Sequence, residues 1–245
     1  MKRNLLKNIF LSLCLVVFPI GMAAKQEATV TSPSGNLTLT AGVDKAGRPY
    51  YSLSRGKEAI LLPSYLGVKL KDGSLDSDFG VMGFVRATKD ETWHQPWGEE
   101  NDVRNHYNEL TMKLAQRKGL KRQLTIVFRV FDDGMGFRYV FPEQKNLKHF
   151  VIMDEETEFC FKGDPEAWTL PYDADYYEGL WTKAPLSKKQ KVCTPITIEA
   201  KPDLYMMLHE ANLTDYASLN VKPVETKEGN VRMRAELVPW SNGDL

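Results

Sequence analysis

The residues that could perform chemistry or bind a sugar are most concentrated between residues 90 and 109. Trp93 and Trp97 could stack on the apolar face of a pyranose ring, because aromatic side chains present a large flat surface. Carboxylates that could act as acids or bases, or bind calcium through oxygen, follow at Glu99, Glu100 and Glu109. A structural loop whose charges satisfy buried backbone groups would have the same composition, and composition alone favours that simpler interpretation.

A second group of oxygen ligands lies in residues 168–178, which read WTLPYDADYYE. Asp173, Asp175 and Glu178 offer the hard oxygen atoms that calcium prefers. A solvated turn also accounts for these residues. On residue types alone, the turn is the favoured interpretation.

Several common catalytic motifs are absent from the sequence. The four histidines show no H-E-x-x-H spacing, so a zinc hydrolase is not supported. There is also no G-x-S-x-G sequence and no phosphate-binding glycine loop.

Short strands must position these residues. Apolar and polar residues alternate over residues 37–42, which predicts a strand with one face on a core. Residues 122–141 are predicted to form two strands joined around Asp133-Gly134, a hairpin signal. Residues 204–208 and 231–238 are further predicted strands. Many short strands separated by turns, with no long helical period, predict an all-β antiparallel sandwich with few short helices.

The first residues predict export. Three basic residues among the first seven precede an apolar run over residues 9–20, and small residues follow at 21–23. This pattern predicts a signal peptide over residues 1–23, a domain over residues 26–245, and a periplasmic or secreted protein. The apolar run is shorter than the roughly 20 residues that a membrane-spanning helix needs. We therefore expect no membrane attachment after cleavage.

The charge and the cysteine content limit the kinds of partner and metal site that we expect. The chain has 32 basic and 32 acidic residues, and loss of the three basic residues of the signal leaves 29 against 32. A nucleic-acid partner, which would favour a basic face, is not expected. Cys160 and Cys193 could pair in an oxidising compartment or remain buried thiols, and they lack the C-x-x-C spacing of a metal site.

Four stretches resemble the N-terminal domain of glycoside hydrolase family 97. The most specific is D-E-T-W-x-x-x-W-G-E-E-x-x-x-R-N-H-Y-N-E-L, residues 90–110. The stretch D-D-G-M-G-F-R-Y-x-F-P, residues 132–142, is similar to the same domain. T-S-P-S-G-N-L, residues 31–37, is similar to its first strand, and L-H-E-A-x-L-x-D-Y, residues 208–216, to a later one. The stretches follow the family's order and span essentially all of the mature chain.

The resemblance implies an exported, calcium-dependent α-glucosidase or α-galactosidase that hydrolyses oligosaccharides. It implies that this domain is a β-super-sandwich, galactose mutarotase-like, which packs on a (β/α)8 catalytic barrel. Glucosidase members invert the anomeric centre with two glutamates, one as acid and one as base. Those groups belong to the barrel. We therefore expect no catalytic residue within residues 26–245, a sequence that ends before the barrel, and no hydrolysis by this chain alone.

The resemblance also implies one calcium ligand from the N-terminal domain. In the family it is a glutamate in an acidic, tyrosine-rich loop after a Trp-x-x-Pro stretch. The matching residue here is Glu178. The loop is a residue or two short of the family pattern, which leaves Asp175 as the alternative. The resemblance implies calcium as the cofactor of the whole enzyme. One ligand cannot hold the ion by itself, because calcium takes roughly six to eight oxygen ligands.

Two other functions stay open. A stand-alone carbohydrate-binding or scaffold sandwich would use Trp93 and Trp97 as an exposed platform. A mutarotase-like isomerase would need an acid–base pair in a cleft, which similarity of fold alone cannot supply. The favoured partners are the enzyme's own barrel and an oligosaccharide substrate.

Overall fold

The computed structural model describes residues 26–173 and 178–238, and strands dominate this part of the chain. Its one helical element is a 3-10 turn, η1 (Leu186–Lys188). The prediction of an all-β protein with few short helices is therefore confirmed. The predicted signal peptide falls outside the described residues. No helix within those residues is long and apolar enough to cross a membrane.

The largest sheet contains eleven antiparallel strands. In order across the sheet they are β1 (Glu27–Thr31), β2 (Leu37–Val43), β3 (Pro49–Arg55), β4 (Glu58–Tyr65), β12 (Glu158–Phe161), β18 (Asn230–Ala235), β17 (Asn220–Lys227), β15 (Val192–Lys201), β13 (Glu166–Pro171) and β14 (Thr182–Pro185), with β16 (Leu204–Leu208) paired to β15. In β2, Leu39 and Ala41 are buried while Thr38 and Thr40 are half-buried. This is the alternation that the sequence predicted.

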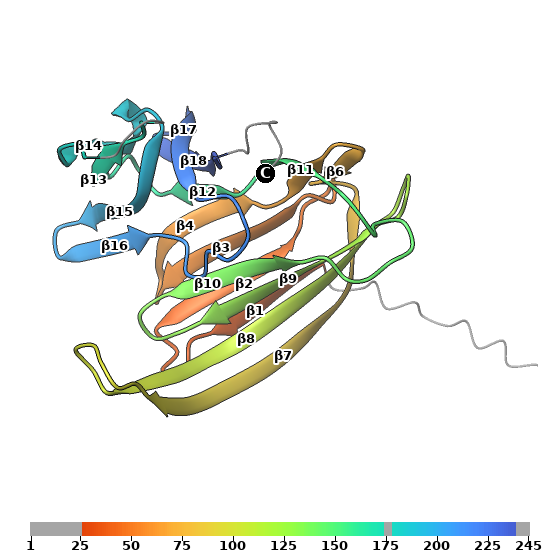
Figure 1. Ribbon diagram of the computed structural model, residues 1–245, viewed down its shortest axis with the longest axis horizontal. Coiled ribbons are helices and arrows are strands. Elements are labelled where there is room, and N and C mark those ends of the chain that lie inside the picture. Colours follow the sequence, from red (N-terminus) through yellow and green to blue (C-terminus); the bar gives the residue numbers. More distant parts are fainter. Residues whose placement is uncertain (1–25, 174–177, 239–245) are drawn as a thin grey trace, which may run out of the picture.

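Two smaller sheets complete the fold (Figure 1). The four-stranded sheet runs β10 (Met135–Val140), β9 (Gln123–Val130), β8 (Asp102–Gln116) and β7 (Phe79–His94). The three-stranded sheet runs β11 (Ile152–Glu155), β5 (Val68–Leu70) and β6 (Gly73–Leu75). The four-stranded sheet lies against β1 and β2 of the largest sheet, so the two sheets form a sandwich.

Aromatic rings join the two layers of the sandwich. Tyr51 of β3 is fully buried, and its ring centroid lies 6.1 Å from that of Phe128 and 5.3 Å from that of Phe137. Phe128 and Phe137 come from β9 and β10, and their centroids are 6.0 Å apart. Tilted ring pairs at these distances add to the stability gained by burial alone. These three rings therefore mark the centre of the interface between the sheets.

A glycine in the turn between β2 and β3 lets that turn pack on the other sheet. Gly47 has a φ of 76°, which favours glycine, and its carbonyl accepts a 3.0 Å hydrogen bond from the Phe79 amide. A Cβ atom at this position would lie 2.5 Å from the Phe79 nitrogen. Any larger residue would push the start of β7 away from the turn.

The predicted strands are largely confirmed. The hairpin predicted over residues 122–141 is β9 and β10, paired from Met135–Val130 to Val140–Thr125. The strand predicted over residues 204–208 is β16, with the same bounds. These segments carry apolar residues at every second position, or large apolar residues throughout, so their pattern is easily recognised.

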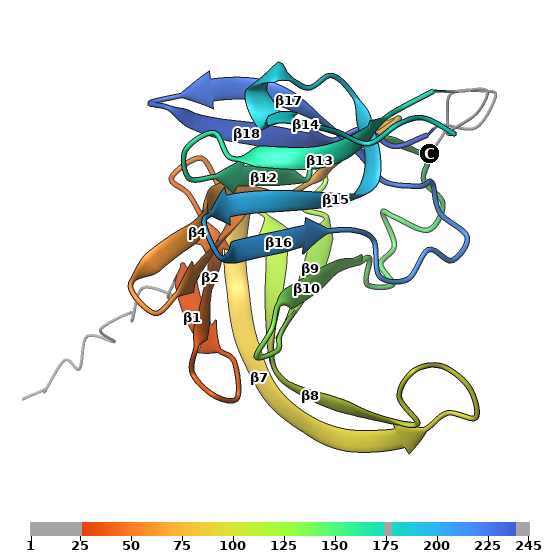
Figure 2. The ribbon, with the colours of Figure 1, turned by 90° about the vertical axis from the view of Figure 1, so that its left-hand side faces the viewer.

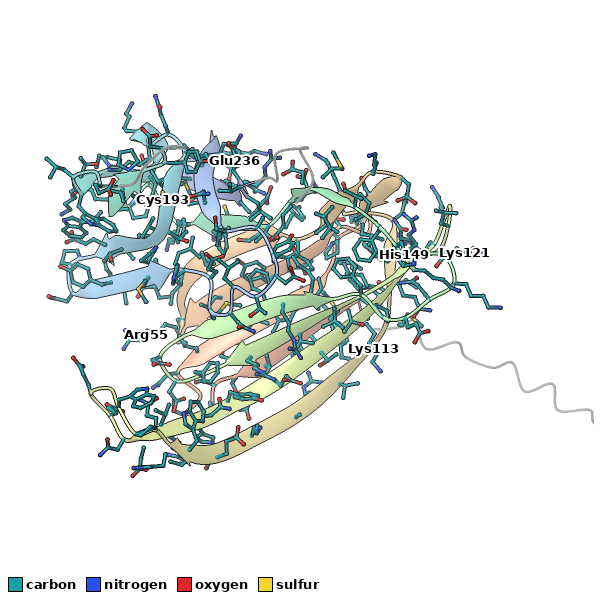
Figure 3. The ribbon with its side chains drawn as sticks, in the orientation of Figure 1. Arg55, Lys113, Lys121, His149, Cys193 and Glu236 are labelled. Carbon is teal, nitrogen blue, oxygen red and sulfur yellow. The ribbon has the colours of Figure 1, made fainter. Side chains whose placement is uncertain are left out.

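Three of the strand assignments need correction. The strand predicted to reach Val238 ends at Ala235, and beyond it the carboxylate of Glu236 pairs with Lys222 and, at 3.5 Å, with Lys191 (Figure 3). Two backbone hydrogen bonds also hold the segment that follows: the Glu236 amide bonds the Asn220 carbonyl at 2.8 Å, and the Val238 amide bonds the Ser218 carbonyl at 3.3 Å. The stretches matched to family strands at residues 31–37 and 208–216 are mostly a turn and a loop. Pro33 and Gly35 explain the first, because both favour turns.

The two cysteines do not pair with each other. Cys160 lies in β12, and Cys193, which is labelled in Figure 3, lies in β15. Strands β18 and β17 lie between β12 and β15 in the sheet. Three strand spacings are roughly 14 Å, whereas a disulfide needs Cα atoms within about 7 Å. Both cysteines remain thiols, but only Cys160 is buried as the alternative expected, whereas Cys193 is half-buried.

Strands β7 and β8 extend well beyond the sandwich. Figure 2 shows their distal parts curving away from β1 and β2. Every side chain of residues 85–94 is exposed, although the backbone stays paired with β8 as far as His94 and Asp102. We call residues 85–109 the distal arm. Tyr107 is buried and some residues of β8 are half-buried, but the β7 side of the arm is held mainly by its pairing with β8.

Candidate functional site

The sequence run that could bind a sugar lies on the distal arm. Trp93 is opposite Val103 on the paired strands and is 48 % exposed. Trp97 is 81 % exposed in the loop at the tip, which is closed by a 2.7 Å hydrogen bond from the Gln95 amide to the Asn101 carbonyl. Among the ring contacts of the described residues, none joins Trp93 to Trp97. The arm therefore brings both tryptophans to the surface but not into one stack.

Two carboxylates of the arm on β7 accept hydrogen bonds from side chains on β8. Asp90 accepts hydrogen bonds from Arg104, and these bonds lower the pKa of its carboxyl. Glu91 accepts from Lys89 and from Asn105, which lowers its pKa as well. Both groups are ionised and held as acceptors, so neither is suited to act as a general acid.

A further carboxylate of the arm, that of Glu109, also has a structural role. Glu109 accepts a 2.9 Å hydrogen bond from Arg129, whose guanidinium lies 4.5 Å from the centre of the Tyr107 ring. Tyr107 in turn packs on Phe131. Glu99 and Glu100 are exposed at the tip. The structural interpretation of Glu109, which composition favoured, agrees with these contacts.

The loop between β13 and β14 carries the predicted calcium ligand. Glu178 is exposed and is followed by Leu180 and Trp181, which are 86 % and 54 % exposed. The loop leaves β13 through Tyr172, whose amide bonds the carbonyl of Lys191 and whose ring lies under the Lys191 ammonium at 3.8 Å. The alternative ligand, Asp175, lies outside the described residues.

Glu178 offers one oxygen ligand for a calcium site. Within residues 26–173 and 178–238, no group of three or more His, Cys, Asp or Glu side chains is placed to hold a metal ion. An exposed carboxylate is a suitable hard oxygen donor for calcium. The remaining ligands would have to come from other residues. The role of Glu178 stays a prediction.

Sequence reasoning missed an aromatic face that includes Trp181 of the same loop. Trp168, Trp181, Thr197 and Tyr205 line a cleft of about 380 Å³. Trp168 was singled out only as part of a matched segment. Trp168 lies between the buried residues Ala167 and Thr169. Because side chains alternate between the two faces of a strand, this position could have predicted that the Trp168 ring lies on the outer face of β13.

One carboxylate is deeply buried and far from either loop in sequence. Glu155 of β11 accepts a 2.5 Å hydrogen bond from the hydroxyl of Thr157 and a 2.9 Å bond from that of Tyr216. The Thr157 hydroxyl also bonds that of Tyr139. Burial raises the pKa of Glu155, and the two hydroxyl donors offset only part of that effect. The network fastens the loop after β16 to the three-stranded sheet.

Comparison with known protein families matches almost the whole described chain. The family model described as Glycosyl-hydrolase 97 N-terminal matches residues 30–241. A curated relative, the retaining alpha-galactosidase of Bacteroides thetaiotaomicron, is 28 % identical over 250 residues. That match covers 96 % of this chain and 35 % of the relative. The chain thus spans about a third of the length of this relative.

Solved structures show the same fold. A Glycoside Hydrolase Family 97 enzyme from Pseudoalteromonas sp. strain K8 superposes with a TM-score of 0.81 at 31 % identity, over 89 % of this chain and 33 % of that one. It was solved in complex with panose and in complex with acarbose. A beta-arabinopyranosidase superposes with a TM-score of 0.75 at 23 % identity, over 85 % and 35 % of the two chains, and shows likeness of fold alone.

Proposed function

This chain belongs to glycosyl-hydrolase family 97 as that family's N-terminal domain, and on that premise we propose that it forms part of an exported α-glycosidase that acts on oligosaccharides. The proposal rests on one observation above all. The family match covers the described sandwich almost completely, while the chain spans about a third of its relatives. The relatives' names supply the substrate class: one is a retaining alpha-galactosidase, and another was solved with panose and with acarbose.

Within this function the sandwich is a support and not the catalyst. Of the carboxylates on the distal arm, Asp90, Glu91 and Glu109 are held by basic or amide partners. The most buried carboxylate, Glu155, bonds two hydroxyl groups of its own domain. A glycosidase needs one carboxyl as acid and another as base or nucleophile on either side of the scissile bond. We assign both to a (β/α)8 barrel on which this domain packs.

The surface around Glu178 is the part of the domain that we assign to the barrel side. Leu180, at 86 % exposure, places an apolar side chain next to an exposed carboxylate. Such a pair suits an interface that is apolar at its centre and supplies one oxygen to a metal site. Calcium bound there would organise negatively charged groups around the substrate. Glu178 would supply one ligand, and Asp175 is the alternative donor in the same loop.

A chimera tests the assignment of Glu178. Residues 30–241 replace the corresponding domain of the Bacteroides alpha-galactosidase, and hydrolysis of an α-galactoside is followed while calcium is varied. We expect the chimera to be active and Glu178→Ala to lower its activity at least tenfold, with partial recovery as calcium is raised. Asp133→Ala, which removes an exposed carboxylate from the β9–β10 turn, is the matched control and should leave activity unchanged. A fully active Glu178→Ala chimera would show that this ligand assignment is wrong.

A further inference from the structure

Four strands at one edge of the largest sheet present a row of side chains on their outer face. The register pairs Trp168 of β13 with Lys183 of β14 and with Thr197 of β15, and Thr197 with Met207 of β16. The adjacent row, which lies two residues further along each strand, contains Glu166, Glu199 and Tyr205. Side chains two residues apart on a strand share a face. All of these side chains therefore stand on the same side of the sheet.

The opposite face of the same strands is the core. Ala167, Ile196 and Ile198 are fully buried. The outer face of an antiparallel sheet is normally polar. Here it instead exposes large apolar groups: Tyr205 is 57 % exposed and Met207 is 72 % exposed. An exposed apolar patch of this kind, on a sheet whose other face already forms the core, indicates a binding surface.

The aromatic rings border a shallow cleft that is largely open to solvent. The Trp168 and Tyr205 centroids lie 6.3 Å apart with their planes at 42°, and Trp181 forms a further wall of the cleft of about 380 Å³. Thr197 lines the same cleft. Sites for small ligands start at about 300 Å³ and combine mostly apolar walls with a few polar groups. The cleft has the size and character of such a site.

Charged groups border the aromatic walls directly. The Lys183 ammonium lies 4.5 Å from the centre of the Trp168 ring and pairs with Glu199 at 2.6 Å and Glu166 at 3.0 Å. A pyranose needs both surfaces at once, since its C–H face packs on an aromatic ring while its hydroxyls bond charged and polar groups. The centre of a protein–protein interface, by contrast, is depleted of charged residues. The arrangement favours a sugar over a protein.

We propose that the outer face of β14, β13, β15 and β16 is a binding site for a hexopyranose unit of an α-linked oligosaccharide, with Trp168 and Tyr205 as the stacking walls. The site uses none of the predicted calcium ligands and requires no hydrolysis. It rests on the proposed function only for the choice of α-linked sugars. Binding, unlike catalysis, can be measured on this chain by itself.

Titration calorimetry on the mature chain tests the site with maltotriose and melibiose as probes. We expect saturable binding of at least one probe with a dissociation constant on the order of 1 mM or tighter. Tyr205→Ala should weaken binding about tenfold and Tyr205→Phe should not, because the phenylalanine ring keeps the stacking wall. Trp168→Ala should abolish binding. Circular dichroism and thermal melting establish that each variant is folded.

Two controls separate this site from its alternatives. Trp97→Ala removes the most exposed ring of the distal arm and should leave binding unchanged. Sorbitol has hydroxyls but no pyranose ring and should not bind. The proposal is overturned if neither probe binds, if sorbitol binds equally well, if binding depends on Trp97, or if folded Tyr205→Ala binds as tightly as the wild type. It is also overturned if the chimera with the barrel no longer binds the probe here, since the face would then be a domain interface.

The binding result and the enzymatic result are independent. A chimera that fails to hydrolyse α-galactosides would count against the proposed function while leaving calorimetry on the mature chain unaffected. Loss of binding in Tyr205→Ala with full hydrolysis by the chimera would support the binding site separately from the catalytic one.

Discussion

Arg104 bonds both carboxylate oxygens of Asp90 across the distal arm, with its Nε and Nη2 atoms at 2.8 and 2.7 Å. The pair lies beyond the last buried residue of the arm, where backbone pairing and side-chain contacts, without burial, hold β7 against β8. Bidentate arginine–carboxylate bonds fix both distance and orientation. The pair is one of several side-chain contacts across the arm, with those of Glu91 to Asn105 and Thr88 to Asn108.

The arm should loosen locally when this pair is broken. Arg104→Ala should increase amide hydrogen exchange across residues 85–109 while leaving the melting temperature unchanged, because the arm lies outside the cooperative core. Mass spectrometry of the exchanged peptides measures this directly. Lys113→Ala, an exposed cation on the part of β8 that lies in the sandwich (Figure 3), is the matched control. Unchanged exchange in Arg104→Ala would show that the pair does not order the arm.

The interface between the two sheets should be the most sensitive part of the core. Phe128→Ala removes a fully buried ring that contacts Tyr51 and Phe137. It should lower the free energy of unfolding by about 3–5 kcal/mol, because it leaves a cavity between the sheets. Urea denaturation provides the measurement. Trp97→Ala, which removes an exposed ring, should change the same free energy by less than about 0.5 kcal/mol. Equal effects of the two substitutions would refute this account of the core.

Stability should fall with rising pH because of Glu155. Its pKa in the folded chain is raised above the usual 4.5 by burial. Below pH 4.5 the group is protonated in both folded and unfolded chains, and the stabilisation is complete. As pH rises from there through the raised pKa, the unfolded chain ionises first and the stabilisation is lost.

Glu155→Gln isolates this effect from other titrating groups. It keeps the shape and a hydrogen-bonding group opposite Thr157 and Tyr216 but cannot ionise. Relative to wild type, the variant should therefore gain stability as pH rises above 4.5. Urea titrations at a series of pH values compare the two proteins. Parallel pH profiles would mean that Glu155 does not titrate in this range.

The sequence revealed the strands whose side chains alternate. Leu39 and Ala41 in β2, and Leu124 and Phe128 in β9, carry apolar side chains at every second position, and each of these strands was predicted. The distal half of β7 gave no such signal, because all of its side chains are exposed. It is a strand because β8, the next strand in the chain, pairs with it, and a strand exposed on both faces shows no apolar alternation that could predict it.

The binding face was missed for the same physical reason. Trp168, Lys183 and Thr197 are separated by many residues and form one row only through the register of β14, β13 and β15. No spacing in the sequence reports that register. Glu178 could be singled out only through resemblance to a family, since an exposed acidic loop is otherwise indistinguishable from a solvated turn.

The most direct test of the central claim is an assay of the purified mature chain against nitrophenyl α-glucoside and α-galactoside, with and without calcium. We predict no turnover above the uncatalysed rate under either condition, because the bond-breaking carboxyls are assigned to the barrel. Calcium-dependent hydrolysis by this chain, abolished by Glu178→Ala, would contradict the account and place a complete active site within the sandwich.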